Sequence, residues 1–326
     1  MENFSGKILS CYEQHALELP LRKLGPFFLR AYKMTADKKY YNILAWHLFC
    51  IVIPRFLLLH EKALQKDFSL PKNLKKYTGT PKNMRAVKRS LFYKNNPSVE
   101  FLDLFTEYLF SIKRYGLYKT ILKKEYNQAI GVLREVNFKN IYITPSSVRY
   151  NSSFAVNTIF FLRSLSVHSL TNDLVALFRK MYFTKEGELQ KTLPRWELQS
   201  LLYSMTHIII AHSHYYERRV QTYFWILDFF SKNITNILQN STLDIIAEVG
   251  LCYRLCGREN EHKQSFEKIT RHIKKNFASR DLPNHSFLVK KYHTNYIIML
   301  LFAKNICYAR GPLLSSHPII KSFQPK

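Results

Sequence analysis

Apolar residues recur three and four positions apart along most of the chain, in long stretches that Gly and Pro seldom interrupt. This spacing is the period of an α-helix, whereas a half-buried β-strand alternates at every second position. The 326 residues include only 9 Gly and 12 Pro. A sandwich or barrel would need turn signals every ~8 to 12 residues. The pattern therefore predicts an all-α protein.

A recurring unit consists of an apolar helix, a short polar link and a more charged second helix. It occurs in four segments: 27–48, 107–126, 159–183 and 244–273. Apolar helices that line a common axis and charged helices that face water would give this contrast. The irregular spacing does not fit short-period repeats. We expect one domain over 1–326, with helical hairpins that form an α/α toroid or an irregular α-solenoid.

Capping residues suggest where the helices begin and end. In the first hairpin, 27–48, Arg30 and Tyr32 are predicted to close one helix, and Asp37 is the predicted start of the next. In the fourth hairpin, 244–273, Asp244 is the predicted N-cap, and Gly257 is expected just past the helix end in the left-handed conformation.

The segment 62–97 breaks this pattern. Ten Lys or Arg residues between positions 62 and 96 have only Asp67 as a counter-charge. Pro and Gly punctuate the segment at Pro71, Gly79, Pro81 and Pro97. We expect a long, basic, partly ordered crossover loop, either functional or simply a solvated linker.

The chain is strongly basic, with 49 Lys and Arg against 23 Asp and Glu and a net charge of +26. This charge suits nucleic acid, an acidic membrane surface or an acidic protein partner. The abundance of Lys, Asn, Ile, Phe and Tyr together is equally typical of an AT-rich genome. The candidate anion-binding residues are Lys75, Lys76, Lys82, Arg85, Lys88 and Arg89.

The run 196–216 predicts a helix with two stripes. One stripe is apolar, and the other is polar or small, with Glu197, Ser200, Ser204 and His207 at helical spacing. Buried polar groups without partners cost about 1 to 3 kcal/mol each, so this face should meet a water-filled cavity or a polar partner. His207 is the first catalytic candidate. Tyr203, Ser204 and Tyr215 are candidate substrate-binding residues.

Glu248 lies among apolar residues of a predicted inner helix. There it would pair with a cation or keep a raised pKa, and it is the second catalytic candidate. The alternative is a favourable interaction with the helix N-terminus. His293, a third catalytic candidate, and Asn295 precede an apolar run, and Asn157 precedes a similar one. Asn157 and Asn295 are candidate substrate-binding residues, or they hydrogen-bond to neighbouring backbone.

No metal or other cofactor is expected. The spacings between His207, His212 and His214 do not match the paired histidines of a zinc-binding helix. Cys252 and Cys256 are one turn apart and are better explained by core packing. The chain also has no phosphate-binding loop, dinucleotide fingerprint or nucleophile elbow.

A cytoplasmic location is expected. The five cysteines are an odd number and do not suggest a disulfide framework. The N-terminus lacks a basic segment followed by an apolar one, so no signal peptide is predicted. The most apolar stretch, 43–59, contains His47, Pro54 and Arg55, and no transmembrane helix is predicted.

Three strings carry a resemblance: LYSMTHIIIAHSHYY, DIIAEVGLCYRLCG and YHTNYIIMLLF. They resemble an uncharacterised bacterial family, a domain of unknown function found mainly in Gammaproteobacteria. The similar part covers about 150–310, with a weaker echo near the start. The RAYKMTADKKY junction is similar to hairpin junctions in α/α-toroid enzymes that act on glycans or peptides, which is an analogy of fold.

Two classes of function follow. The first is a protein with a central polar cavity, either a glycan- or peptide-processing enzyme or a small-molecule-binding protein, with His207, Glu248, His293, Asn295 and Asn157 around one opening. The second is a basic scaffold for nucleic acid, an acidic membrane surface or a protein partner. Whether the chain is an enzyme stays open at this point.

Overall fold

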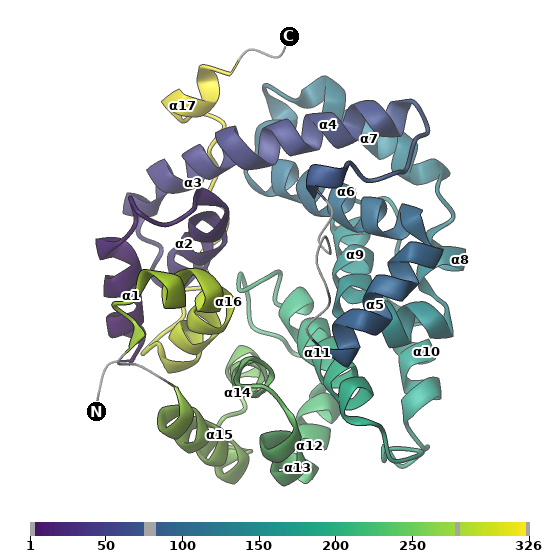
Figure 1. The fold of residues 1–326 in the computed structure, drawn as a ribbon, viewed down its shortest axis with the longest axis vertical. Helices are drawn as coiled ribbons and strands as arrows, with labels where there is room; N and C mark the ends of the chain where they lie inside the picture. The colour runs from purple at the N-terminus through teal and green to yellow at the C-terminus, as the bar shows by residue number, and fades with distance from the viewer. Residues whose placement is uncertain (1–3, 75–82, 278–280, 324–326) are drawn as a thin grey trace. The chain divides into compact units, whose positions relative to one another are not determined.

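The regular structure of the protein is helical. The computed structural model describes residues 4–74, 83–277 and 281–323. In these residues, 17 α-helices and five short 3-10 or π turns follow one another, and the one β-type contact is an isolated bridge between Phe183 and Leu189 (Figure 1). The all-α prediction is confirmed. The toroid or solenoid arrangement stays a prediction.

The contacts divide the chain into two compact units, and each unit is discontinuous in sequence. Unit 1 comprises Met1–Ile51 and Ile209–Pro312, and unit 2 comprises Val52–Ile208 and Leu313–Lys326. The expectation of one domain over 1–326 stays a prediction. The two units are described separately below.

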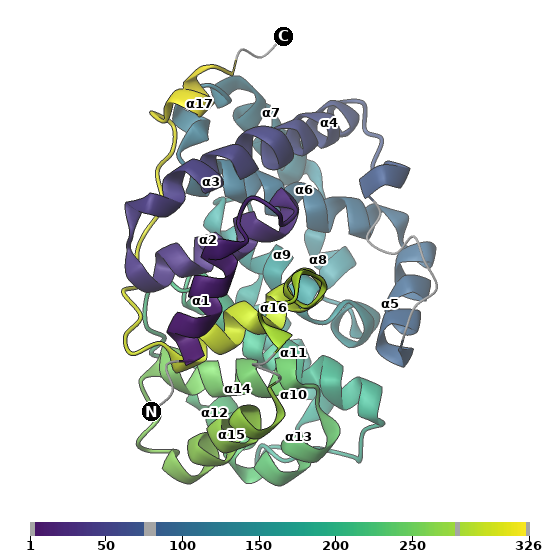
Figure 2. The ribbon, with the colours of Figure 1, turned by 60° about the vertical axis from the view of Figure 1, so that its left-hand side comes forward.

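Unit 1 is built around α16. Its helices are α1 (Phe4–Gln14), α2 (Leu21–Thr35), α3 (Tyr41–His47), α12 (Phe224–Lys232), α13 (Ile234–Asn240), α14 (Leu243–Cys256), α15 (Lys263–Asn276) and α16 (His285–Phe302), together with the end of α11 (Arg195–His212). Helix α16 packs against α1, α2 and α14 (Figure 2). The apolar run predicted from the sequence is buried from Asn295 to Leu301, because helices contact α16 on several sides.

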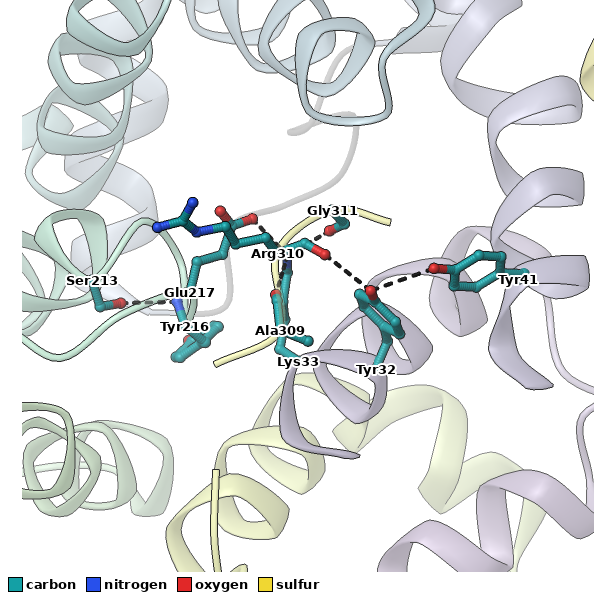
Figure 3. A network of polar contacts seen from close by, with 9 residues as sticks. All are labelled: Tyr32, Lys33, Tyr41, Ser213, Tyr216, Glu217, Ala309, Arg310 and Gly311. Atoms are coloured by element: carbon teal, nitrogen blue, oxygen red, sulfur yellow. Dashed lines mark hydrogen bonds and ion pairs between the residues drawn. The ribbon is translucent and has the colours of Figure 1, made fainter. Parts of the chain in front are cut away.

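Lys33 joins α2 to the extended segment 303–312. Its side chain is fully buried, and Nζ donates to Glu217 Oε1 at 2.5 Å, to the Ala309 carbonyl at 2.8 Å and to the Gly311 carbonyl (Figure 3). Tyr32 donates to the Arg310 carbonyl beside it. An ammonium has three protons to donate, and these three acceptors offset the cost of burying its charge.

Unit 2 is built around α6. Its helices are α4 (Ile53–Leu64), α5 (Met84–Asn95), α6 (Pro97–Arg114), α7 (Lys123–Glu135), α8 (Phe138–Tyr142), α9 (Ser153–Ser164), α10 (Thr171–Tyr182), α17 (Pro318–Lys321) and most of α11. Helix α6 packs against α4, α5, α7 and α9. The π turn η5 (Ser147–Asn151) leads into α9 and contacts α5.

A buried carboxylate, Asp103 of α6, ties the centre of unit 2 together. Its Oδ1 accepts hydrogen bonds from Tyr142 at 2.7 Å and Thr158 at 2.6 Å, and its Oδ2 accepts from Tyr93 at 2.9 Å and Asn151 at 3.3 Å. The donors come from α5, η5, α8 and α9, so one side chain cross-links five elements. A buried charge needs such donors to offset its lost hydration.

Several predicted helix boundaries shift. Helix α2 continues past Arg30 and Tyr32 to Thr35, so the predicted end was too early, and Ala36 closes the helix in the left-handed conformation. Asp37 accepts from the Lys39 amide and caps the short 3-10 helix η1 (Lys38–Tyr40), as a start signal should.

The fourth predicted hairpin corresponds to α14 and α15. The N-cap of α14 is Thr242, whose hydroxyl accepts from the Ile245 amide, so the assignment of Asp244 as the cap was wrong. Gly257 ends α14 in the left-handed conformation, as predicted. Helix α14 is buried almost throughout and α15 only on one face, which is the predicted contrast between the two helices of a hairpin.

The described part of the predicted basic loop, residues 62–74 and 83–97, is largely helical, and residues 75–82 lie outside the described residues. The end of α4, the turn η3 (Lys72–Leu74), all of α5 and the start of α6 lie in it. Asn83 accepts from the Ala86 amide and begins α5 as an N-cap, a signal that the charge pattern concealed.

One helical run among the described residues, Lys38–Leu64, is long and apolar enough to cross a membrane by length and composition alone. Core helices of globular proteins pass the same test, and 44% of its most apolar window is buried inside the protein. The expectation of no transmembrane helix stays a prediction.

Candidate functional site

Three polar side chains meet on two neighbouring helices of unit 1. Asp244 and Glu248 are four residues apart on α14, so both lie on one face of that helix. His293 projects from α16, which begins at Asn284 with an N-cap bond to the Phe287 amide. Helices α14 and α16 pack along their length and hold the three side chains together.

The imidazole of His293 lies between the two carboxylates. Its Nδ1 is 2.8 Å from Asp244 Oδ1, and its Nε2 is 3.9 Å from Glu248 Oε1. Thr294 donates to the same Oδ1 of Asp244 at 3.2 Å. One ligand atom from each of Asp244, Glu248 and His293 lies within 4.8 Å of the others, a spacing that suits a metal ion.

The exposure of the three side chains falls in steps. His293 is 36% exposed, Asp244 18% and Glu248 1%. The cluster therefore reaches the surface at His293 and ends in the interior at Glu248. A small molecule arriving from solvent would meet the imidazole first.

An ionised carboxylate only accepts hydrogen bonds, so the Nδ1 of His293 is the donor to Asp244. In the neutral imidazole the lone pair is then on Nε2, toward Glu248. Burial on its own would lower the pKa of His293, but the neighbouring Asp244, and less strongly Glu248, raise it above its ordinary value. The imidazole therefore keeps its proton to a higher pH than an ordinary histidine does.

Arg30 and two phenols line the same region. The guanidinium of Arg30 lies 4.9 Å from the ring centre of Tyr296 and 5.9 Å from that of Tyr216. Burial raises the pKa of both phenols, and the charge of Glu248 raises it further, while Arg30 opposes the shift. Both phenols therefore stay protonated at neutral pH and can donate hydrogen bonds.

Gly250 does not leave space beside Glu248. A Cβ at this position would lie 2.9 Å from Ile269 Cγ2 and 3.1 Å from Leu301 Cδ1. The glycine instead allows α15 and α16 to approach α14 closely. The small residues Ala247 and Gly250 beside Glu248 would suggest room for a ligand, but the side chains of the neighbouring helices fill the space at Gly250.

The polar stripe of α11 faces polar partners within unit 2. Glu197 accepts two hydrogen bonds from Arg149, Ser204 is 3.2 Å from the Ser152 hydroxyl, and His207 Nδ1 is 2.9 Å from Asn157 Oδ1. These partners lie in η5, in α9 and at Ser152, the residue between the two elements. Of the two alternatives for this stripe, the structure supports the polar partner.

Tyr203, the next candidate, is almost buried, and the guanidinium of Arg85 lies 4.0 Å from its ring centre. In unit 1, Tyr215 is buried in the left-handed conformation. Asn295 is fully buried and donates to Tyr12, which in turn donates to the Leu288 carbonyl. Asn295 thus links α16 to α1, two residues from His293 but toward a different helix.

The structure brings together Glu248 with His293, and His207 with Asn157. The first pair belongs to unit 1 and the second to unit 2. One opening shared by all five candidate residues therefore stays a prediction.

The anion-binding candidates differ in accessibility. Lys75, Lys76 and Lys82 lie outside the described residues. Arg89 is 5% exposed with its guanidinium over the Phe154 ring, and Arg85 is half-buried against Tyr203. Lys88 is half-buried as well. The arginines of α5 therefore pack within unit 2 rather than extend into solvent.

Five residues of the unit 1 cluster were not assigned to it from the sequence: Asp244, Thr294, Arg30, Tyr216 and Tyr296. Asp244 had a usable signal, because it lies four residues before Glu248 and shares its helix face. Its assignment as an N-cap hid that signal. Arg30 and Tyr216 are far away in the sequence, and no local pattern marks them.

The structure so far defines an all-helical protein with an Asp–His–Glu cluster at the surface of one of its two units. The chain belongs to a family described as a domain of unknown function (DUF3541), whose model matches residues 2–326. The match confirms the resemblance to a family without an assigned function and extends it beyond 150–310 to nearly the whole chain. That this family is bacterial stays a prediction. A search of curated proteins and a search of solved structures found no match to the chain.

Proposed function

We propose that this protein is a hydrolytic enzyme that activates water at Asp244, His293 and Glu248. The observation that carries the proposal is the 2.8 Å hydrogen bond between Asp244 and His293 Nδ1. It orients the imidazole and leaves Nε2 as a base on the side of Glu248. A carboxylate that holds a histidine in one tautomer is the arrangement that hydrolases use to prepare a general base.

In this proposal Nε2 and Glu248 are the two basic groups that act on a water molecule. The water gives up its proton as it attacks the substrate, and the Asp244 carboxylate stabilises the positive charge that develops on the imidazole. The guanidinium of Arg30 and the hydroxyls of Tyr216 and Tyr296 are available to donate hydrogen bonds to the negative charge that develops on the substrate.

The spacing of the two carboxylates favours the peptide-type substrate over the glycan. Their ligand atoms lie within 4.8 Å of each other, with the imidazole beside both. Inverting glycosidases need about 6.5–9.5 Å between their two carboxylates to admit a water molecule, and retaining ones need about 5–5.5 Å with the sugar between them. Here the imidazole of His293 takes the place between Asp244 and Glu248 where the sugar would have to lie. We therefore propose an amide or ester bond, of the kind found in peptides, as the bond that is cleaved.

The test is a panel of chromogenic amides, esters and glycosides assayed with the full chain. Glu248→Gln and His293→Gln should each lower kcat/KM for any substrate found by a factor of about 10² or more, since a general base contributes on this scale. Asp244→Asn should lower kcat by about 10² to 10⁴ with little change in KM, because it disturbs the orientation of the base rather than binding.

Matched controls come from unit 2. Glu197→Gln alters a buried glutamate, and His207→Gln alters a hydrogen-bonded histidine. Both residues lie on α11. These variants should keep the activity of the unaltered protein. Equal activity in all five variants, or no hydrolysis of any amide or ester by the unaltered chain, would contradict the proposal.

A further inference from the structure

We propose that a divalent metal ion of the Zn²⁺ or Mn²⁺ type binds between His293 Nε2 and Glu248. The inference rests on the proposed function, since the ion would be the means by which the site activates water. No metal was expected from the sequence, because the spacings of His207, His212 and His214 match no zinc-binding helix. The ligands come from two helices that pack side by side.

The gap between the two ligand atoms fits an ion better than a hydrogen bond. Nε2 and Oε1 are 3.9 Å apart, beyond hydrogen-bond distance. Two ligands of a tetrahedral zinc ion, each at about 2.1 Å, would be about 3.4 Å apart. A movement of about half an ångström by the two side chains would close that difference.

Asp244 prepares the histidine for this role. Histidines that bind metals usually donate their other ring N–H to a carboxylate, which fixes the tautomer and makes the free nitrogen a stronger ligand. The Nδ1 bond to Asp244 has this form, and Thr294 in turn donates to Asp244. Asp244 is therefore a positioning residue for the imidazole.

The remaining coordination positions would be filled from the exposed side of the site. His293 is 36% exposed, so water can reach an ion bound at Nε2. A site with few protein ligands and open positions is typical of catalytic rather than structural zinc. One imidazole with carboxylate oxygens suits Zn²⁺ and Mn²⁺, whereas soft ions prefer thiolates. The two carboxylates also outweigh the single charge of Arg30.

The direct test is titration of the full, EDTA-treated chain with Zn²⁺ and, separately, Mn²⁺ by isothermal calorimetry. We expect one saturable site for each protein molecule. His293→Gln and Glu248→Gln should weaken binding at least tenfold, and Asp244→Asn should weaken it by about 10- to 100-fold. His207→Gln should leave the affinity unchanged, which separates this site from adventitious binding by the other histidines.

A second measurement uses the unaltered protein, so its result does not depend on whether a variant folds. Mn²⁺ broadens NMR signals of nearby nuclei, and the imidazole signals of His293 should disappear before those of the other 11 of the 12 histidines. Absence of a saturable site, unchanged affinity in His293→Gln, or uniform broadening of all the histidines would each overturn the proposal.

The failure of this inference can be told apart from failure of the proposed function. If amide or ester hydrolysis persists in EDTA and no ion binds, the metal inference is wrong and Nε2 acts on water directly. If one ion binds at His293 and no substrate of the panel is hydrolysed, the metal inference holds and the hydrolytic function fails.

Discussion

Two buried glutamates, Glu197 in unit 2 and Glu248 in unit 1, look alike in sequence and differ in structure. Both lie near the start of long apolar helices, and their side chains are 2% and 1% exposed. Glu197 accepts hydrogen bonds from Arg149 Nε at 2.6 Å and Nη2 at 2.8 Å. Glu248 faces an imidazole at 3.9 Å, and that imidazole is itself partly exposed.

The difference teaches that burial alone does not mark a functional carboxylate. A guanidinium stays charged at every accessible pH and binds a carboxylate in a fixed two-pronged geometry, which suits a permanent link. An imidazole gains and loses its proton near neutral pH, which suits proton transfer or metal binding. The chemistry of the partner therefore separates the structural glutamate from the candidate one.

The largest effect should come from the most completely satisfied carboxylate, Asp103. Replacing it with Ala would remove the acceptor that Tyr93, Tyr142 and Thr158 share. Tyr93 would keep its bond to Asn151 Oδ1 at 2.9 Å, and Tyr142 its longer contact with the Val99 carbonyl at 3.4 Å. We expect a loss of about 3 to 5 kcal/mol in the free energy of unfolding. Chemical unfolding followed by circular dichroism measures it.

The exposed Asp173, which is 3.7 Å from Lys139, is the control for Asp103. Its replacement with Ala should change stability little. If Asp103→Ala were no more harmful than Asp173→Ala, the assignment of Asp103 as the structural centre of unit 2 would fail.

Glu197→Gln should have the next largest effect. It removes one partner of an ion pair and leaves the charge of Arg149 without its carboxylate. Arg149 is 35% exposed, so water recovers part of the loss, and we expect about 2 kcal/mol rather than the ~3–5 kcal/mol of a fully buried pair. A thermal melt against the unaltered protein gives the comparison.

Glu248→Gln should change stability by less than about 1 kcal/mol, because functional sites are not optimised for stability and the amide keeps the shape of the carboxylate. The same thermal melt decides. A loss equal to that of Glu197→Gln would show that Glu248 is a structural ion partner and would remove the contrast between the two glutamates.

The smallest expected effect is the pH dependence of the unfolding free energy that His293 causes. Burial opposes protonation of His293, but Asp244 and Glu248 raise its pKa above that of the unfolded chain. The protonated form is thus favoured by folding, and its stabilising contribution is full below about pH 6.5 and is lost as the pH rises through the folded pKa. The unfolding free energy of unaltered protein minus that of His293→Gln, measured in EDTA, should be larger at pH 6 than at pH 8.5.

An NMR titration of the His293 imidazole tests whether Asp244 raises its pKa. Asp244→Asn removes the carboxylate charge beside His293, so the pKa of His293 should fall in that variant. An unchanged pKa would show that Asp244 does not tune the imidazole.

Much of the helical content could be predicted from the sequence, because the period of apolar residues is a local property. Gly257 and Asp37 also marked helix ends correctly, since capping depends on a few neighbouring residues. The prediction of a loop was wrong for Met84–Asn95, because the charge and prolines of this region resembled a loop while Asn83 supplied a cap for α5. Charge composition says little about whether a short helix forms.

The candidate site could be predicted in part. Glu248 and His293 stood out as polar residues on apolar helices, and the structure brings them together. Asn295 stood out for the same reason and instead binds Tyr12, because one helix shows different faces to different neighbours. The roles of Arg30 and Tyr216 depend on tertiary packing across the sequence, which periodicity does not encode.

The link made by Lys33 has a consequence for the order in which the protein is made. Its acceptors on Glu217, Ala309 and Gly311 lie 184, 276 and 278 residues further along the chain. The ribosome releases α1 and α2 long before these partners exist, and closing such long loops is slow. Residues 52–208 form most of unit 2 in one continuous stretch, so this unit can begin to pack earlier. Helix α2 can therefore pack against α3 early, but its face that carries Lys33 stays uncovered by these partners until residues 309–311 have been synthesised.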